Sequence, residues 1–487
     1  MDQTPGDNVD EELLATDSED DAMYLSDSGE SSMEDDDEGE EAETDNEIEE
    51  DCEDEDIDLG ESDTKRTYIP TKDNALTPRQ MEYDESAYVM YHKAECGYPC
   101  LSFDVIVDNL GSGEERANSY PHTIQLVSGT QAPKVHVNKL LVMKMSNLVK
   151  IKNKKANSDD EDEDVSEEED DDGEPQLECA QIPHNGAVNR VRSVTLGSKQ
   201  VAASWSELGH VHLWDLTEQL KAVNDHEAMQ LYSKRKQPPK PLFSFGGHNS
   251  EGFGLDWSSI APGYLASGDC KKNIHVWKPL EGFSWHVDQM PLIGHTDSVE
   301  DLQWSPTEQH MLASCSVDKS IRVWDIRAKP SSSMITVENA HESDINVIAW
   351  NRKEAAFLLS GGDDGAIKTW DLRQFGKAKA PQSIATFKQH IAPITSLEWH
   401  PSDSTVFGSS GDDNQIILWD LSVERDDEAE KEANDEDDAQ VNKLPPQLLF
   451  IHQGQNEIKE IHWHSQIPGL VISTALSGFD VFRTINV

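Results

Sequence analysis

The chain has 487 residues and a formal net charge of −55, from 95 acidic and 40 basic residues. This excess of negative charge argues against direct binding to nucleic acid, which requires a basic surface. The N-terminus lacks a basic region followed by an apolar one, and no apolar run approaches 18 residues. Neither a secretory signal nor a membrane span is therefore expected, and the protein is expected inside the cell.

Three acidic runs carry nearly all of the excess charge. Residues 1–64 contain 31 Asp or Glu and no Lys or Arg, residues 158–174 contain 13, and residues 424–438 contain 10. Acids and bases nearly balance in the rest of the chain. Dense like charge with few apolar residues is typical of disordered segments. We therefore expect a disordered tail over 1–67 and two acidic insertions, at 158–174 and 424–438, in an otherwise ordinary globular protein.

After the acidic tail, the sequence predicts an α-helix over 76–97. Thr77 can cap its start, and Gly97 can end it. Tyr88 and Tyr91 fall on one side of this helix, where they are candidate contacts for a partner. The alternative is a helix that packs on the rest of the protein for stability alone.

A repeat with a fixed spacing organises residues 98–487. Four His residues are each followed nine residues later by one Trp and twenty-nine residues later by another: His248, His295, His341 and His390. Between them, apolar and polar residues alternate in three short runs joined by tight turns, and a fourth run precedes the next His. Weaker copies begin at His184 and His452, and a seventh fits before them. Four strands in about 45 residues predict a propeller blade, so the fold class is an all-β, seven-bladed propeller.

The order of the strands predicts how the ring closes and where the insertions lie. Residues 122–130, 137–148 and 178–183 are strands of blade one, so the second acidic run precedes the outer strand of that blade. The third run follows blade six. Residues 100–106 are expected to form the outer strand of the last blade, because closure by an N-terminal strand removes an exposed edge.

The strong repeats also share a His, a Ser, an Asp and a Trp at constant spacing. The His can bond the Asp six residues before the late Trp and the Ser ten residues before it, which favours a buried structural relay over a metal ligand or a catalytic base. The relay sets are His295, Ser314, Asp318 and Trp324; His341, Ser360, Asp364 and Trp370; and His390, Ser409, Asp413 and Trp419. Lys271 and Leu208 occupy the Asp position before Trp277 and Trp214, so those two blades are predicted to lack the acceptor.

The Trp-Asp pairs at 214–215, 324–325, 370–371 and 419–420 resemble WD repeats. Together with CLSFDVI and an acidic insertion ending in PPQLLFIH, they resemble the histone-binding WD-repeat family of chromatin complexes. Within that family, the acidic tail and the segments YPHTIQLVSGTQA, HNGAVNRVRS and ALSGFDVFRT are similar to the glutamate-rich WD-repeat proteins of ribosome assembly.

This resemblance implies a groove between the helix and the acidic insertion that takes a basic client. It implies a non-enzymatic chaperone in ribosome biogenesis that holds a basic ribosomal protein of the large subunit and delivers it to pre-ribosomal particles. The expected location is the nucleus and nucleolus, and also the cytoplasm. The partner-binding candidates are Tyr88 and Tyr91 with Asp426, Asp427, Glu428, Asp435, Glu436, Asp437 and Asp438.

Elementary electrostatics supports the same direction. An acidic run with a charge about every 4 Å approaches the charge density of nucleic acid, so it can cover the basic patches of an RNA-binding protein until RNA displaces it. Serines with an acid three residues later are candidate phosphorylation sites for acid-directed kinases, which would add further negative charge: Ser18, Ser32, Ser158 and Ser166.

Other functions fit the sequence less well. An enzyme is not expected, because phosphate loops, nucleophile elbows and metalloprotease motifs are missing, and no cofactor or metal is expected. Of the six cysteines, only Cys96 and Cys100 lie close, in a spacing that fits neither a zinc nor a redox motif. Two alternatives stay open: a histone chaperone, and a substrate receptor of a cullin ubiquitin ligase using the W-D-x-R motifs at Arg327 and Arg373. Both arginines are also explained as surface ion pairs. A monomer is expected.

Overall fold

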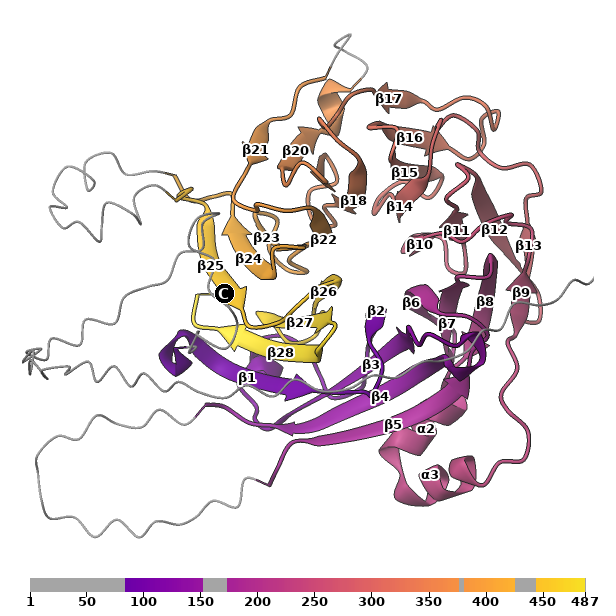
Figure 1. Cartoon of the computed structure of the whole chain (residues 1–487), viewed down its shortest axis with the longest axis vertical. Coiled ribbons are helices and arrows are strands. Elements are labelled where there is room, and N and C mark those ends of the chain that lie inside the picture. The colour runs from indigo at the N-terminus through magenta and orange to yellow at the C-terminus, as the bar shows by residue number, and fades with distance from the viewer. Residues whose placement is uncertain (1–83, 152–172, 376–380, 425–443, 487) are drawn as a thin grey trace, which may run out of the picture. The chain divides into compact units, whose positions relative to one another are not determined.

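The computed structural model describes residues 84–151, 173–375, 381–424 and 444–486. The strands of this part form seven four-stranded antiparallel sheets around a central axis (Figure 1). The prediction of an all-β, seven-bladed propeller is confirmed. The acidic tail at 1–67, the start of the predicted helix and nearly all of both acidic insertions lie outside the described residues, as do the four candidate phosphorylation sites.

Blades one to three follow one another along the chain, and the first strand of each lies nearest the axis (Figure 1). Blade one contains β2 (Cys100–Ile106), β3 (His122–Thr130), β4 (Lys139–Leu148) and β5 (Gln176–Pro183). Blade two contains β6 (Val188–Leu196), β7 (Lys199–Ser206), β8 (His210–Asp215) and β9 (Phe243–Phe245). Blade three contains β10 (Gly254–Trp257), β11 (Leu265–Gly268), β12 (Ile274–Leu280) and β13 (Ser284–Val287).

Blades four to six repeat this order, and blade seven borrows its fourth strand. Blade four contains β14 (Val299–Trp304), β15 (Met311–Ser316), β16 (Ile321–Asp325) and β17 (Ile335–Val337). Blade five contains β18 (Ile345–Trp350), β19 (Phe357–Gly362), β20 (Ile367–Asp371) and β21 (Ala385–Phe387). Blade six contains β22 (Ile394–Trp399), β23 (Val406–Gly411), β24 (Gln415–Asp420) and β25 (Leu448–Gln453). Blade seven contains β26 (Glu460–Trp463), β27 (Leu470–Ala475), β28 (Gly478–Thr484) and, outermost, β1 (Tyr88–Ala94).

The described helices are short and lie in the connections between strands. They are α1 (Glu114–Ala117), α2 (Thr217–Asn224) and α3 (His226–Ser233), with 3₁₀ turns η2 (Glu85–Ala87), η3 (Val135–Val137) and η4 (Leu372–Gln374). The pair α2 and α3 joins β8 to β9, and α2 packs against β4 and β5 of blade one.

The predicted helix at 76–97 is wrong for the part that the structure describes. After the single turn η2, the chain enters β1, which pairs antiparallel with β28 so that Tyr91 faces Phe482. Tyr88 and Met90 are 7% and 0% exposed, an alternation of period two that fits a strand. Local helix signals are weak, and the open edge of β28 offers a row of backbone hydrogen bonds that outweighs them.

Ring closure by an N-terminal strand is present, but a different segment supplies it. Residues 100–106 form β2, the innermost strand of blade one, and were wrongly expected at the outer edge of blade seven. Phe103 and Ile106 are 0% and 1% exposed, which suits an inner strand, whereas the half-exposed β1 suits an edge. The residues between Glu424 and Leu444 join β24 to β25, so the third acidic insertion lies within blade six and not after it.

The His-Ser-Asp relay is visible in blade four. Nδ1 of His295 lies 2.9 Å from Asp318 Oδ2, Nε2 lies 2.6 Å from Ser314 Oγ, and Trp324 Nε1 donates to the same Ser at 2.8 Å. Every polar atom is satisfied when the His is neutral with its proton on Nδ1. Burial alone would raise the pKa of Asp318, but the hydrogen bond from His295 holds that pKa well below its usual value.

Blades five and six contain the same arrangement at His341 and His390. The prediction that blade three lacks the acceptor is wrong, because Asp269, eight residues before its Trp, takes the place of Lys271 and lies 2.8 Å from His248. In blade two, Nδ1 of His184 instead meets the backbone oxygen of Gly186 at 2.8 Å. A carboxylate therefore accepts from His248 but not from the Nδ1 of His184.

Candidate functional site

One face of the ring gathers two kinds of loop. Because the strands of each blade are antiparallel, the connector that enters each inner strand and the turn between the second and third strands lie at the same end of the blade. We call this end the mouth face. It surrounds the axis on which the seven inner strands converge (Figure 1).

The mouth face carries a set of exposed or half-buried carboxylates, which we call the acidic rim. It consists of Glu251, Asp297, Glu300, Glu342, Asp344, Asp363, Asp412 and Glu457, from blades three to seven. Lysines share these loops, and Lys459 lies 3.8 Å from Asp412. Burial raises the pKa of Glu300, and the neighbouring Asp344 and Asp301 raise it further. Negative charge is therefore crowded at this point, and a cation placed there would relieve it.

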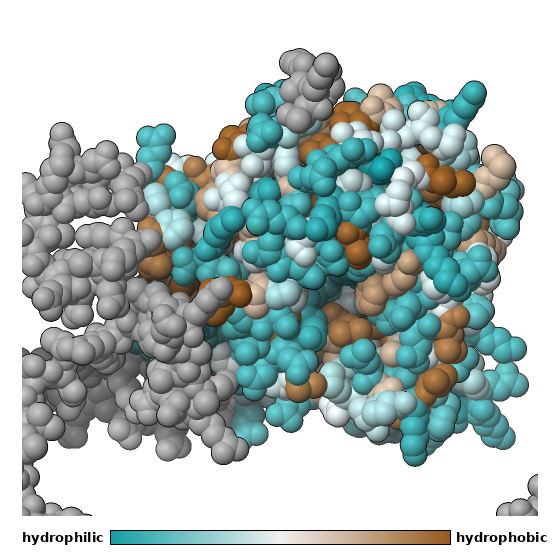
Figure 2. All heavy atoms as spheres, turned by 45° about the horizontal axis from the view of Figure 1, so that its top comes forward, coloured by the Kyte–Doolittle hydropathy of each residue, from teal (hydrophilic) through white to brown (hydrophobic). Residues whose placement is uncertain are grey.

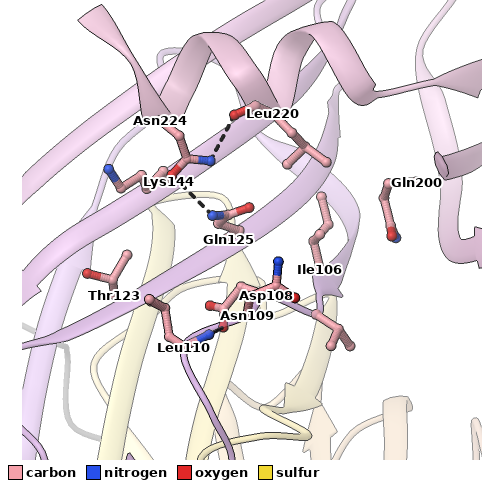
Figure 3. A pocket seen from close by; sticks show the side chains of 11 residues that line it. Ile106, Asp108, Asn109, Leu110, Thr123, Gln125, Lys144, Gln200, Leu220 and Asn224 are labelled. Atoms are coloured by element: carbon pink, nitrogen blue, oxygen red, sulfur yellow. Dashed lines mark hydrogen bonds between the residues drawn. The ribbon is translucent and has the colours of Figure 1, made fainter. Parts of the chain in front are cut away.

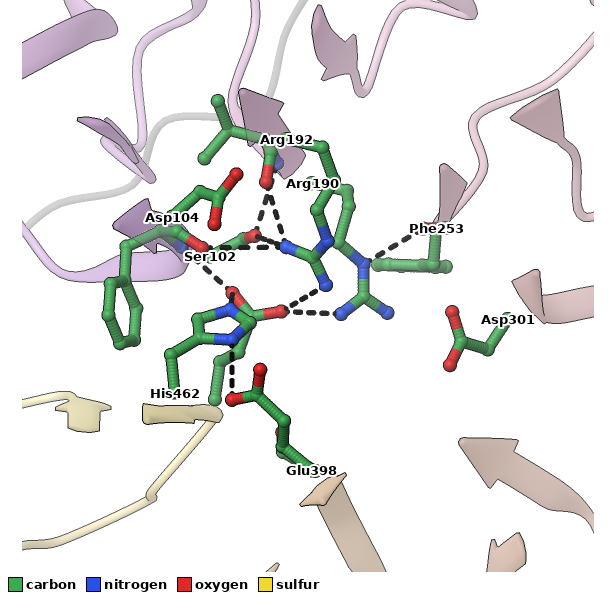
Figure 4. Close-up of polar contacts among 12 residues, drawn as sticks. Ser102, Asp104, Arg190, Arg192, Phe253, Asp301, Glu398 and His462 are labelled. Carbon is green, nitrogen blue, oxygen red and sulfur yellow. Dashed lines mark hydrogen bonds and ion pairs between the residues drawn. The ribbon is translucent and has the colours of Figure 1, made fainter. Parts of the chain in front are cut away.

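Below the rim, charged side chains meet in the centre of the ring (Figure 4). Glu460 of β26 is 1% exposed and accepts from Arg190 Nη1 at 2.8 Å and Arg192 Nη2 at 2.7 Å, both on β6. His462, two residues after Glu460, places Nδ1 3.1 Å from Glu398 Oε2 of β22. We call these five residues the buried cluster.

The electrostatics of the buried cluster follow from this pairing. Burial opposes the charge on Glu460, but Arg192, His462 and Arg190 outweigh it and hold the pKa of that carboxyl well below its usual value. Burial likewise opposes protonation of His462, but Glu398 and Glu460 raise its pKa to about 10. The imidazole is therefore a cation at neutral pH. A general base must accept a proton near neutral pH, so this cluster is unsuited to that role.

The same inner strands are joined by hydrogen bonds from carboxylates to the next blade. Asp256 accepts from the Trp304 backbone at 2.7 Å, and Asp301 accepts from Ile348 at 3.1 Å. Glu398 accepts from Trp463 at 2.8 Å, and Glu460 accepts from Phe103 at 2.8 Å, which joins blade seven to blade one. These buried acids therefore hold neighbouring blades together, and their role is structural.

A separate pocket of about 520 Å³ lies between the strands of blade one and α2 (Figure 3). Gln125 Nε2 donates to Asn224 Oδ1 at 3.3 Å across it. Its charged members are already engaged: Lys144 lies 3.3 Å from Glu178, and Asp108 lies 2.7 Å from Arg116. The pocket therefore presents amide and apolar groups and no nucleophile next to a base.

The two W-D-x-R turns place their arginines in solvent. Arg327 is paired with Asp325 at 2.7 Å and Arg373 with Asp371 at 2.9 Å, and the two arginine side chains are 66% and 62% exposed. Each arginine thus folds back on the Asp of its own turn, as a surface ion pair does.

The sequence-predicted partner residues are distributed as follows. The seven acids from Asp426 to Asp438 lie outside the described residues. Tyr88 is buried in blade seven, where its Oη lies 2.8 Å from His452 Nδ1. Tyr91 is half-buried and donates to Asp480 at 2.7 Å. Both tyrosines therefore help to attach β1 to its blade, and within the described residues they do not line a groove beside a helix.

The described ends of the chain nevertheless meet in one sector. Ala87, Ile151, Leu449 and Phe450 pack in one apolar cluster on blades six and seven, and the Ile151 amide donates to Val89 of β1 at 3.1 Å. Ile151 immediately precedes residues 152–172, and Leu449 follows residues 425–443 by a few positions. Both acidic insertions are therefore joined to the ring at neighbouring points.

Surface composition favours polar recognition. On the face shown in Figure 2, hydrophilic side chains predominate and apolar ones are scattered. Among the described residues there is no group of three or more His, Cys, Asp or Glu placed to hold a metal ion. Within the same ranges, no helix has the length and apolar character needed to cross a membrane.

Comparison with known proteins agrees with the fold. A family model for histone-binding protein RBBP4 and its counterpart in the CAF1 complex matches residues 79–149, and the WD domain, G-beta repeat model matches residues 288–325, 332–371 and 381–420. The chain is similar to Glutamate-rich WD repeat-containing protein 1 of Dictyostelium discoideum, with 50% identity over 83% of this chain and 82% of that protein.

Two further relatives are each 41% identical to this chain. Ribosome assembly protein rrb1 of Schizosaccharomyces pombe matches 83% of this chain and 81% of its own length. Protein HEAT STRESS TOLERANT DWD 1 of Arabidopsis thaliana matches 87% of this chain and 92% of its own length. Identity at this level over most of both chains confirms the resemblance seen in the sequence: the chain belongs to the family of glutamate-rich WD-repeat proteins that includes Ribosome assembly protein rrb1.

Proposed function

We propose that this protein is a non-enzymatic chaperone of ribosome biogenesis that holds a basic ribosomal protein of the large subunit and delivers it to pre-ribosomal particles. The observation that carries the proposal is the acidic rim, a folded surface of carboxylates at the mouth of a ring whose own arginines Arg190 and Arg192 are already paired with Glu460. The rim is therefore available to cations from outside. A relative named for ribosome assembly supports the same direction.

The acidic runs extend the same chemistry. Their charge density approaches that of nucleic acid, so they suit a client whose basic patches are destined for RNA. Because both insertions join the ring at neighbouring points, they can reach one client together. Binding of this kind weakens with salt, and RNA can displace it. The proposed sites of action are the nucleus and nucleolus, with capture of the newly made client in the cytoplasm.

The test is affinity isolation of the full chain after nuclease treatment. We expect one basic large-subunit ribosomal protein in stoichiometric amount, bound more weakly as salt rises. A rim variant, Glu251→Gln with Asp344→Asn, Asp363→Asn and Asp412→Asn, should lower affinity about tenfold or more, from four charge pairs of up to about 1 kcal/mol each.

The matched control removes four exposed charges away from the mouth: Glu227→Gln, Glu281→Gln, Glu308→Gln and Glu354→Gln. It should bind the client as the unaltered chain does. Equal losses in both variants, or loss of the client on nuclease treatment, would contradict the proposal. Stoichiometric histones in place of a ribosomal protein would favour the alternative that the histone-binding family match at residues 79–149 suggests.

A further inference from the structure

Two thiols meet where the ring closes. The connector 95–99 leads from β1, the outer strand of blade seven, to β2, the inner strand of blade one. Cys96 is half-buried in this connector, and Cys100, the first residue of β2, is 2% exposed. Their sulfur atoms are 3.6 Å apart. The C-x-x-x-C spacing alone did not suggest a pair, because the contact depends on how the connector turns.

The backbone holds this turn in place. Gly97 has a φ of +88°, a left-handed conformation that lets the chain fold back within a few residues. The backbone oxygen of Pro99 accepts from the Gln131 amide at 2.8 Å, and that of Cys100 accepts from Thr474 Oγ1 at 2.8 Å. Cys100 is thus fixed in the core, and Cys96 is returned to it by the turn.

The two thiols have different environments. A hydrogen bond from Cys100 lowers the pKa of Cys96 and outweighs burial, which acts against it. The same hydrogen bond and burial raise the pKa of Cys100. Nearby on β5, burial raises the pKa of Cys179 to about 11. Because the thiolate is the nucleophile, Cys96 is the reactive sulfur, Cys100 is placed to resolve its oxidised form, and Cys179 is unreactive.

We propose that Cys96 and Cys100 are a modification site, at which hydrogen peroxide forms a reversible disulfide. The Cys96 thiolate attacks one peroxide oxygen, the O–O bond breaks, and the released hydroxide takes a proton to give water, leaving a sulfenic acid. The Cys100 sulfur then attacks the Cys96 sulfur, the S–O bond breaks, and hydroxide leaves with the Cys100 proton as a second water. The two sulfurs lose two electrons and the peroxide gains them. A dithiol reductant reverses the bond by exchange.

The structural change is small and local. A disulfide has an S–S length of about 2.05 Å, so the sulfurs approach one another by roughly 1.5 Å. Closing this five-residue ring tightens the connector, which lies on the mouth face and exposes 44% of Tyr98. Oxidation therefore changes the surface beside the acidic rim and leaves the sheets in place. This chemistry is the same whichever client the rim binds.

The test is differential alkylation and mass spectrometry of the full chain after brief exposure to hydrogen peroxide. Cys52→Ser serves as the background, because Cys52 lies outside the described residues and can form mixed disulfides. We expect the peptide with Cys96 and Cys100 to lose two hydrogens and regain them with dithiothreitol. It should do so at least about fivefold faster than Cys270, a lone half-buried thiol, is modified.

Two variants separate the roles of the sulfurs. Cys100→Ser should trap Cys96 as a sulfenic acid that dimedone labels, whereas Cys96→Ser should leave Cys100 unmodified at the same exposure. Cys270→Ser is the control and should leave the disulfide yield unchanged. Oxidation of Cys96 no faster than of Cys270, or its conversion to sulfinic acid while Cys100 stays free in the unaltered pair, would overturn the proposal.

Discussion

Replacing Glu460 with Gln tests whether the buried cluster holds the ring together. Gln has the same shape and keeps an oxygen for the Phe103 amide, but it leaves Arg190 and Arg192 without their shared counter-charge. Removing one partner of a buried ion pair costs about 3–5 kcal/mol. Unfolding entropy of about 2.1 cal/mol/K per residue, over ~400 residues of propeller, gives about 0.8 kcal/mol/K, so the midpoint of thermal unfolding should fall by roughly 4–6 °C.

The assay is a thermal scan of the full chain at pH 7, with Glu457→Gln as the control. Glu457 is an exposed member of the acidic rim, so its loss should change stability by less than about 0.5 kcal/mol and the midpoint by less than about 1 °C. The loss at Glu460 should persist from low to high salt, since buried pairs are weakly screened. A midpoint that falls no further than in the control would refute the structural role of the cluster.

Two other predictions concern charged groups of the ring. His462 has a folded pKa of about 10 against about 6.5 unfolded, so its charge contributes stability that is fully present below pH 6.5 and is lost as pH rises through 10; relative to His462→Gln, the advantage of the unaltered chain in thermal scans should shrink between pH 7 and 10, and a constant advantage would contradict a protonated imidazole. Arg327→Ala with Arg373→Ala should leave the unfolding midpoint and client capture unchanged because both side chains are exposed, and loss of a co-purifying cullin ligase in this variant would support the receptor alternative.

The repeat was predictable because its spacing is a physical constraint. A His at the blade entrance must reach a Ser and an Asp on fixed strands, so the distance to Trp324 along the chain recurs at Trp370 and Trp419. Blade three shows the limit of counting positions, since Asp269 reaches its His from a different place in the turn. Hydrogen-bond geometry in space, not sequence distance, decides which carboxylate accepts.

The segment before the propeller was mispredicted for a related reason. Capping residues and a one-sided pattern fit a helix, yet the decisive factor for Tyr88–Ala94 is the unpaired edge of β28, which lies almost 400 residues later. Long-range pairing of this kind leaves only a weak local signal, here the burial of alternate residues. The thiol contact of Cys96 was likewise invisible, because it depends on the turn at Gly97.

The buried cluster had a signal that a finer inspection could have used. Charged residues stand at alternate positions in VNRVRS and KEIHWH, segments that the repeat assigns to inner strands. Side chains of one face of an inner strand converge on the axis, so alternate charges there must meet charges from other blades. Arg190 and Arg192 therefore required an acidic partner, and Glu460 was a candidate from its own alternation with His462.

The division of charge within the ring explains why its mouth stays negative. Arg190 and Arg192 lie directly below the acidic rim and could neutralise it, but both are bonded to Glu460. Arg190 lowers the pKa of Glu300, yet burial and the neighbouring acids keep that pKa above its usual value. The cations of the core are thus committed to holding blades together, and the carboxylates above them keep an attraction for positive charge that only another molecule can satisfy.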